Sequence, residues 1–186
     1  MSAPIADIVF VDVETTGLDP DKDSVIQVGV VRTDYTGTQV KARMCLKVKP
    51  STPVHPRAAA VNGYTPEGWA DAVEPAAAAL HLAAISQGAE FAGHCVWFDV
   101  RFCENLLKKN GVRVPWGRRN IDTQTLVHLM RAQNPAMNGT NLQAALEELG
   151  GQRDAVHDAA EDAEWSRRVY AHVMAQYTSE KLAQVG

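Results

Sequence analysis

Two acidic residues stand at the end of a strongly apolar segment near the N-terminus. Residues 8–13 read IVFVDV, the apolar and β-branched composition of a buried strand, and Asp12 is followed by Glu14. Residues two apart in a strand point to the same face, which puts these carboxylates roughly 6–7 Å apart. Such a pair repels, and oxygen ligands suit Mg²⁺ or Mn²⁺. The pattern indicates either a hard-cation site or a strand end exposed to solvent.

A second group of polar residues lies near the C-terminus, where residues 155–165 read AVHDAAEDAEW. Asp158 and Glu161 have the spacing of a capping box, with Asp158 as the helix N-cap. His157 then falls just before the helix and Asp162 in its first turns, so both side chains can face one cleft. Each also has an ordinary explanation: a solvent-exposed loop histidine, and an acid that complements the helix dipole.

The segment 91–103, FAGHCVWFDVRFC, places Asp99 near the start of a helix that directly follows a short strand. The helix dipole alone explains an acid at this position. It does not explain why three such segments occur in one chain in this order. Asp122, another acid, stands where a helix N-cap is expected and is left out of the candidate site.

The elements that must hold these side chains alternate along the chain in the manner of an α/β domain with a mixed sheet. Three strands come first, the second and third of them as a hairpin or meander around a turn at residues 35–37, and strands then mix with helices. Pro53 and Pro56 are predicted to open a loop, and Thr140 or Asn141 to cap the helix that ends at Gly150. The predicted strands are 6–13, 24–33, 39–49, 90–93 and 119–121, and the predicted helices are 75–88, 96–109, 122–131, 140–150 and 159–177.

The composition predicts one compact domain over residues 1–186, because 46% of the residues are apolar. No signal peptide is apparent, and the longest apolar run is too short for a bilayer, so we expect a cytoplasmic protein with no membrane association. Three scattered cysteines argue against a disulfide framework or structural zinc site. A net charge of −4 argues against broad capture of a polyanion. The oligomeric state is left open.

Three motifs in this order resemble the DEDDh 3′-to-5′ exonucleases. They are DVETTGLD at residues 12–19, HCVWFD at 94–99 and HDAAEDA at 157–163, and the connecting segment at 56–67 also matches. The resemblance spans about residues 7–170. It implies a ribonuclease-H-like fold, with a mixed five-stranded sheet flanked by helices.

The resemblance also implies two Mg²⁺ or Mn²⁺ ions held by Asp12, Glu14, Asp99 and Asp162. Asp12 would bridge the ions, Glu14 and Asp162 would serve the ion on the nucleophile side, and Asp99 would hold the other. His157 would be the general base toward the attacking water.

Substrate contacts are implied for Thr15, Thr16 and Leu18, with Leu18 wedged beside the last base, and for Asn62 and Phe98. A purely structural place in the core explains Phe98 equally well. The loop 113–119, with three arginines and Trp116, could follow a single-stranded backbone and stack a base, or be an ordinary solvated loop.

The predicted function is release of nucleoside monophosphates from the 3′ end of single-stranded nucleic acid, with DNA favoured over RNA and a DNA polymerase as a possible partner. The alternatives are RNA trimming and an inactive exonuclease fold that only binds nucleic acid. Two residues depart from the family pattern: Cys95 replaces the usual Asn, and Asp158 stands where many relatives have Arg.

Overall fold

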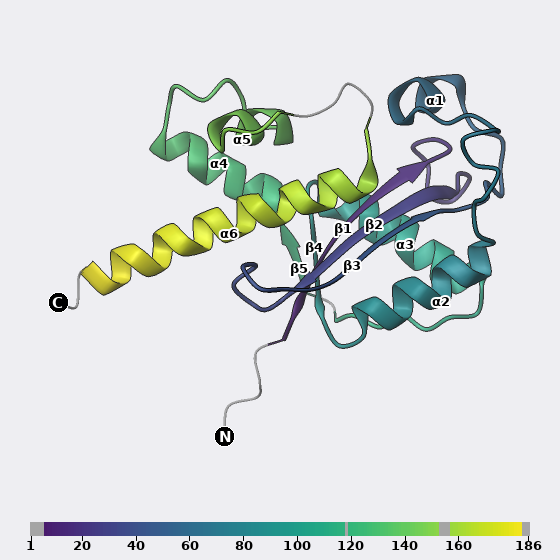
Figure 1. The fold of residues 1–186 in the computed structure, drawn as a ribbon, viewed down its shortest axis with the longest axis horizontal. Coiled ribbons are helices and arrows are strands. Elements are labelled where there is room, and N and C mark those ends of the chain that lie inside the picture. The colour runs from purple at the N-terminus through teal and green to yellow at the C-terminus, as the bar shows by residue number, and fades with distance from the viewer. Residues whose placement is uncertain (1–5, 118, 153–156, 184–186) are drawn as a thin grey trace.

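A five-stranded mixed sheet with helices on both faces makes up the fold (Figure 1), in a computed structural model that describes residues 6–117, 119–152 and 157–183. The strand order is β3-β2-β1-β4-β5. The predicted fold class is confirmed. The strands are β1 (Ile8–Thr15), β2 (Val25–Thr33), β3 (Val40–Lys47), β4 (Glu90–Gly93) and β5 (Asn120–Asp122). The helices of the described part are α1 (Pro56–Asn62), α2 (Pro75–Ser86), α3 (Val96–Lys109), α4 (Thr123–Gln133), α5 (Leu142–Glu148) and α6 (Ala159–Ala183).

β1 lies at the centre of the sheet, as its apolar composition predicts. It pairs antiparallel with β2 and parallel with β4, and β2 pairs antiparallel with β3. The register places Asp12 opposite Gly29 and Glu14 opposite Gln27. The two acids therefore lie at the end of the central strand, where β2 still pairs with β1 but β4, which pairs only as far as Phe10, does not.

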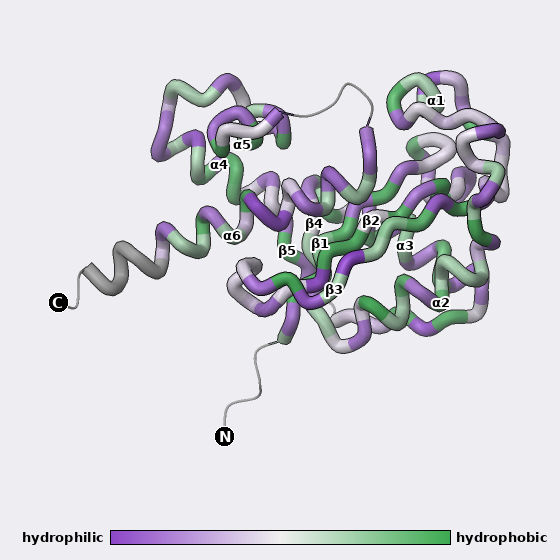
Figure 2. Tube along the Cα trace, in the orientation of Figure 1, coloured by the Kyte–Doolittle hydropathy of each residue, from purple (hydrophilic) through white to green (hydrophobic). Residues whose placement is uncertain are grey.

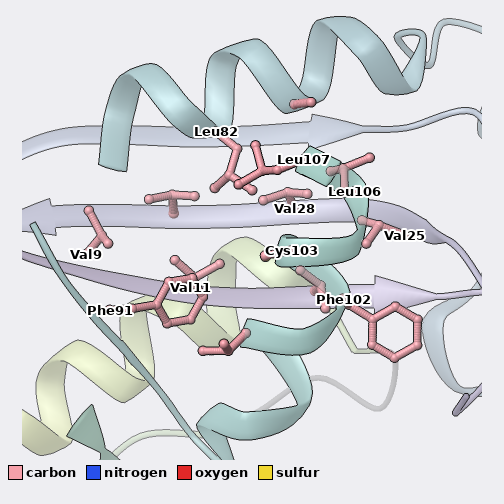
Figure 3. Packing of buried hydrophobic residues seen from close by; sticks show 14 of the residues in the cluster. Val9, Val11, Val25, Val28, Leu82, Phe91, Phe102, Cys103, Leu106 and Leu107 are labelled. Carbon is pink, nitrogen blue, oxygen red and sulfur yellow. The ribbon is translucent and has the colours of Figure 1, made fainter. Parts of the chain in front are cut away.

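The two faces of β1 contact different helices. Val9 and Val11 point into a core shared with α2 and α3, where Leu82 and Leu107 pack against the sheet (Figure 3). Residues of the other parity belong to a second core under α6, in which Phe10 stacks against Tyr170 with ring centroids 5.5 Å apart.

Asp12 and Glu14 have the parity of the face that α6 covers, because residues two apart along a strand share a face. Hydrophobic residues predominate along β1 and β2 (Figure 2). The same face that buries Phe10 thus supplies the acids at its far end.

Helix α1 corrects the sequence prediction, which placed only a loop after Pro53 and Pro56. Pro56 occupies the first turn of this helix and Gly63 ends it in the left-handed conformation, with φ 67°. Proline suits a first helical turn because its fixed φ is already helical and its missing N–H is not needed there. The alanines that follow also favour a helix. The sequence predicted a loop because only the prolines were considered.

The predicted helix caps are confirmed at three places. Asp122 accepts from the Gln124 backbone N–H, Asn141 accepts from that of Ala144, and Asp158 accepts from the first turn of α6. Within the described ranges, no helix has both the length and the apolarity that crossing a membrane requires.

Candidate active site

A cavity of about 1030 Å³ opens at the end of β1, between α1 on one side and α3, α4 and α5 on the other. Its lining includes nine of the ten residues proposed from the sequence: Asp12, Glu14, Thr15, Leu18, Asn62, Phe98, Asp99, His157 and Asp162. Residues separated by as many as 150 positions in the chain therefore border a single cavity.

Glu14, His157 and Asp162 come closest together. One potential ligand atom from each lies within 4.8 Å of the other two, and His157 Nδ1 is 3.9 Å from Asp162 Oδ2. Glu14 and Asp162 are buried, whereas His157 is half-buried. Carboxylate oxygens and an imidazole at this separation are a donor set that a divalent cation can use.

Asp99 adds a buried carboxylate to the same cavity. Its Oδ1 accepts from the Val13 backbone N–H at 3.1 Å, which connects α3 to the central strand. Burial raises the pKa of Asp99 well above its usual range, and the negative charges of Glu14 and Asp162 raise it further. Mutual repulsion of these carboxylates favours a cation among them.

The backbone around His157 is anchored to two other elements. Its N–H donates to the Val61 carbonyl of α1 at 3.1 Å. The next residue, Asp158, accepts from the backbone N–H groups of Ala160 at 2.9 Å and Glu161 at 3.2 Å. Asp158 thus has a structural use at the start of α6.

The turn after β1 is held by side chains around it. Thr15 Oγ1 donates to the Gly17 carbonyl at 2.6 Å, and Asn62 Nδ2 donates to the Thr15 carbonyl at 3.1 Å. Leu18, at the tip of the turn, is 84% exposed and borders the cavity. Its exposure leaves an apolar side chain free to meet a base.

Thr16 and Phe98 differ in how they relate to the cavity. The Thr16 side chain is fully buried, does not line the cavity, and accepts from the Ser24 backbone N–H at 2.9 Å. Phe98 lines the cavity and also packs against Phe102, with ring centroids 4.7 Å apart. Phe98 thus both lines the cavity and packs against the core, the two roles that the sequence left open.

The loop 113–119 corrects a second expectation. Trp116 is buried and packs against Phe91, with ring centroids 4.9 Å apart, so its indole cannot stack a base. Phe91 is a buried residue of β4, and Trp116 packs against it in the same hydrophobic core. Neither Arg113 nor Arg119 lines the cavity, and Arg118 lies outside the described residues.

His55, Arg57 and Asp23 are residues of this region that the sequence reasoning missed. His55 and Arg57 line the cavity beside Leu18. Asp23 is buried behind the turn, with one oxygen 3.3 Å from His55 Nε2 and the other accepting from the Asp19 backbone N–H at 2.9 Å. Pro56 could have indicated them in the sequence, because it marks the first turn of α1. Residues 55–57 at that turn line the same cavity as the acids.

An exonuclease family model matches residues 9–170, which contain the sheet from the second residue of β1 onward, the cavity lining and every residue of the acidic cluster. This chain belongs to the exonuclease family. The three motifs had indicated the DEDDh 3′-to-5′ branch, and that relationship is confirmed.

Curated relatives of this exonuclease domain are longer proteins. The 3′-5′ exonuclease DinG of Bacillus subtilis is 28% identical over 178 residues, which are 95% of this chain and 18% of DinG. The DNA polymerase III subunit epsilon of Haemophilus influenzae is 30% identical over 172 residues, 87% of this chain and 65% of the subunit. The chain therefore spans less than two thirds of these relatives.

Solved structures of exonuclease I share the fold. A zinc-bound complex of the E. coli enzyme with single-stranded DNA superposes with a TM-score of 0.79 at 21% identity, covering 92% of this chain and 41% of that one. Exonuclease I from Methylocaldum szegediense gives 0.76 at 24% identity, covering 95% and 42%. At these identities the likeness concerns the fold of the exonuclease domain.

Proposed function

We propose that residues 1–186 act as one exonuclease domain that removes nucleoside monophosphates from the 3′ end of single-stranded nucleic acid, with DNA preferred over RNA. The observation that carries the proposal is that ligand atoms of Glu14, His157 and Asp162 lie within 4.8 Å of one another, in a cavity that Asp12 and Asp99 also line.

The acids fit a site for Mg²⁺ or Mn²⁺. They offer carboxylate oxygens, the ligands that hard divalent cations prefer, and their mutual repulsion is relieved by positive charge. Asp12, Glu14, Asp99 and Asp162 would hold two ions. When bound, these ions would lower the pKa of the attacking water and stabilise the negative charge that develops on the leaving 3′ oxygen.

His157 is positioned to accept a proton. In hydrolysis a water oxygen bonds to phosphorus while the bond from phosphorus to the 3′ oxygen breaks, and the water proton must leave. His157 Nδ1 lies 3.9 Å from Asp162 Oδ2, so the ring faces the acids while its side chain remains 40% exposed. An imidazole with a reference pKa of about 6.5 suits this transfer near neutral pH.

The terminal nucleotide would lie between the turn after β1 and the start of α3. Leu18 offers an exposed apolar surface on one side and Phe98 a half-buried ring on the other. Thr15 and Asn62 keep the turn in place. A single strand fits this arrangement because each unpaired base exposes an apolar face.

DNA as the preferred substrate is supported by the relatives. Two are a 3′-5′ exonuclease and a DNA polymerase subunit, and exonuclease I, which shares the fold, has been solved with a dT13 oligonucleotide. A DNA polymerase is accordingly the protein partner we propose. Co-elution with a replicative polymerase in size-exclusion chromatography tests it, and separate elution at concentrations that hold a polymerase–subunit pair together counts against it.

The activity is tested with 5′-labelled single-stranded DNA and RNA of equal sequence, incubated with Mg²⁺, Mn²⁺ or a chelator. We expect a ladder that shortens from the 3′ end, depends on metal, runs faster on DNA and disappears in Asp12→Ala. Faster RNA shortening would reverse the substrate preference. No nucleotide release from either polymer, together with intact nucleic-acid binding, would identify a binding module instead.

A further inference from the structure

Gln27 is a buried amide on β2, directly opposite Glu14 in the sheet register, and it contacts the start of α6. Its Nε2 donates to Asp158 Oδ2 at 2.9 Å, and its Oε1 accepts from the Ala159 backbone N–H at 3.3 Å. Both polar groups of one side chain are therefore bound to two consecutive residues at the helix start. Such a pair of bonds fixes both the position and the direction of the helix entry.

Asp158 uses its two carboxylate oxygens for different purposes. Oδ2 accepts from Gln27, whereas Oδ1 accepts from the backbone N–H groups of Ala160 and Glu161 in the first turn of α6. The capping carboxylate is thus also the connection between helix and sheet. An ordinary N-cap would stabilise the helix without fixing where it lies.

Gly29 makes this close approach possible. It lies two residues after Gln27 on the same face of β2, opposite Asp12. A Cβ atom at this position would lie 2.1 Å from the Ala159 carbonyl oxygen, which is far inside van der Waals contact. The backbone of α6 therefore rests directly on the sheet at the level of the acids.

The residues held in this way flank the proposed catalytic groups. His157 directly precedes Asp158, and the Asp162 backbone N–H donates to the Asp158 carbonyl at 3.0 Å. We infer that Gln27 and Asp158 form a clamp that positions His157 and Asp162 against Glu14. Both are positioning residues, and the inference rests on the proposed function.

The clamp can be tested by reversing its hydrogen bond. Gln27→Glu places a carboxylate against the Asp158 carboxylate, so the two repel and α6 is displaced. Adding Asp158→Asn restores an N–H donor on the opposite side, keeps an oxygen for the helix cap and leaves an oxygen for the Ala159 N–H. The double variant has the same net charge as the natural pair.

We expect Gln27→Glu to lower kcat on single-stranded DNA by roughly 10- to 100-fold with KM changed less than about threefold, because small misplacement of reacting groups is costly. The double variant should recover to within about threefold of wild type. Mn²⁺ binding, measured by calorimetry without substrate, should weaken and recover in parallel. Gln39→Glu, the same change at an exposed residue of the β2–β3 turn, should alter neither.

Each outcome decides the inference. It is overturned if Gln27→Glu keeps kcat and Mn²⁺ affinity near wild type, or if the folded double variant fails to recover. If Gln27→Glu does not fold, the double variant must be folded and active for the clamp to stand. If wild type itself releases no nucleotide, the proposed function fails, and the Mn²⁺ affinities still decide the clamp.

Discussion

At the scale of single residues, the position of His157 leads to a kinetic prediction. Its ring faces Asp162 but is 40% exposed, so its loss removes a proton acceptor without opening the core. We expect His157→Ala to lower kcat by about 10²- to 10⁴-fold, the usual contribution of general acid–base catalysis. Metal binding by calorimetry and DNA binding by fluorescence anisotropy should remain largely intact.

The matched control for this variant is His81→Ala, which removes an exposed imidazole on α2. It should leave turnover unchanged. Near-normal turnover by His157→Ala would exclude His157 as the base, whereas a collapse of metal binding would instead identify it as a ligand.

Cys95 leads to a prediction about stability. It is the only non-glycine residue of the described chain with positive φ, at 59°, and its backbone N–H donates to Asp122 Oδ1 at 3.1 Å. Left-handed geometry costs an ordinary L-residue about 1–2 kcal/mol, and Asn tolerates it better. Asn is also the residue that the family pattern has here.

We therefore expect Cys95→Asn to raise the free energy of unfolding by up to about 1 kcal/mol, as part of that backbone cost is recovered. Urea denaturation measures the change. Cys45→Asn, a second exposed cysteine but one in a regular strand, should bring no such gain. Equal effects of the two substitutions would mean that backbone geometry is not the cause.

At the scale of elements, Glu164 attaches α6 to the edge of the sheet. Burial opposes its ionisation, but hydrogen bonds from Arg167, Arg43 and Arg168 outweigh burial and lower the pKa of Glu164 from 4.5 to about 2. A carboxyl whose pKa is lower in the folded state stabilises the fold above its unfolded pKa. That contribution disappears as the pH falls from about 4.5 to 2.

Replacing Glu164 by Gln should thus lower the free energy of unfolding at pH 7 by about 1–2 kcal/mol, after allowance for solvent screening of the 17% exposed side chain. Urea unfolding at a series of pH values should show the difference between variant and wild type shrinking below pH 4.5. Glu67→Gln, at an exposed position, is the control and should show no difference at any pH. A pH-independent loss would contradict the ionic explanation.

Elements whose signal is local were predictable from the sequence. β1, α3 and the caps at Asp122 and Asp158 follow from apolar periodicity and N-cap chemistry, and they appear where expected. α1 was missed because a proline can begin either a loop or a helix. Trp116 was misplaced because nothing near it in sequence reveals that Phe91 needs a partner.

The acids themselves were recognisable through their motifs, but what holds them was not. Gln27 and Gly29 are unremarkable strand residues in sequence. Their importance depends on the register that places them opposite Glu14 and Asp12, and on the helix from the far end of the chain that rests on them. Such long-range contacts leave no local pattern.

At the scale of the whole molecule, net charge and cavity charge oppose the approach of a polyanion. The chain carries −4, and four carboxylates line the cavity among the residues that the structure describes. Among the lining residues in the part of the chain that the structure describes, Arg57, at the cavity wall formed by α1, is the permanent cation. We expect it to attract phosphates upstream of the scissile bond, beyond the reach of the acids.

Arg57→Ala should therefore raise KM for an oligonucleotide several-fold, and the effect should shrink at high salt because the contact is electrostatic. The p-nitrophenyl ester of thymidine 5′-monophosphate has a single phosphodiester, and its hydrolysis should be unchanged. Arg101→Ala, which removes an exposed arginine that does not line the cavity, should affect neither substrate. Equal loss on both substrates would place Arg57 at the scissile phosphate instead.

The acids of the cavity lie close together, and this arrangement lowers the stability of the fold when no cation is bound. Burial and the nearby Glu14 and Asp162 raise the pKa of Asp99, so this carboxyl costs the fold stability as the pH rises above the pKa of an unfolded aspartate. Asn at position 99 keeps an oxygen for the Val13 N–H and removes the charge. In chelator, Asp99→Asn should raise the melting temperature, increasingly so as the pH rises above the pKa of an unfolded aspartate.

Saturating Mg²⁺ should reverse that order. A ligand at one hundred times its dissociation constant stabilises the folded state by about 2.7 kcal/mol, and only a protein with the full set of carboxylates gains this. By differential scanning calorimetry, Asp99→Asn should have the higher melting temperature in chelator, and wild type should have the higher melting temperature in saturating Mg²⁺. If the variant were less stable than wild type in chelator as well, Asp99 would be a structural acid whose charge the fold requires, and an equal gain from Mg²⁺ in both proteins would exclude Asp99 from the cation site.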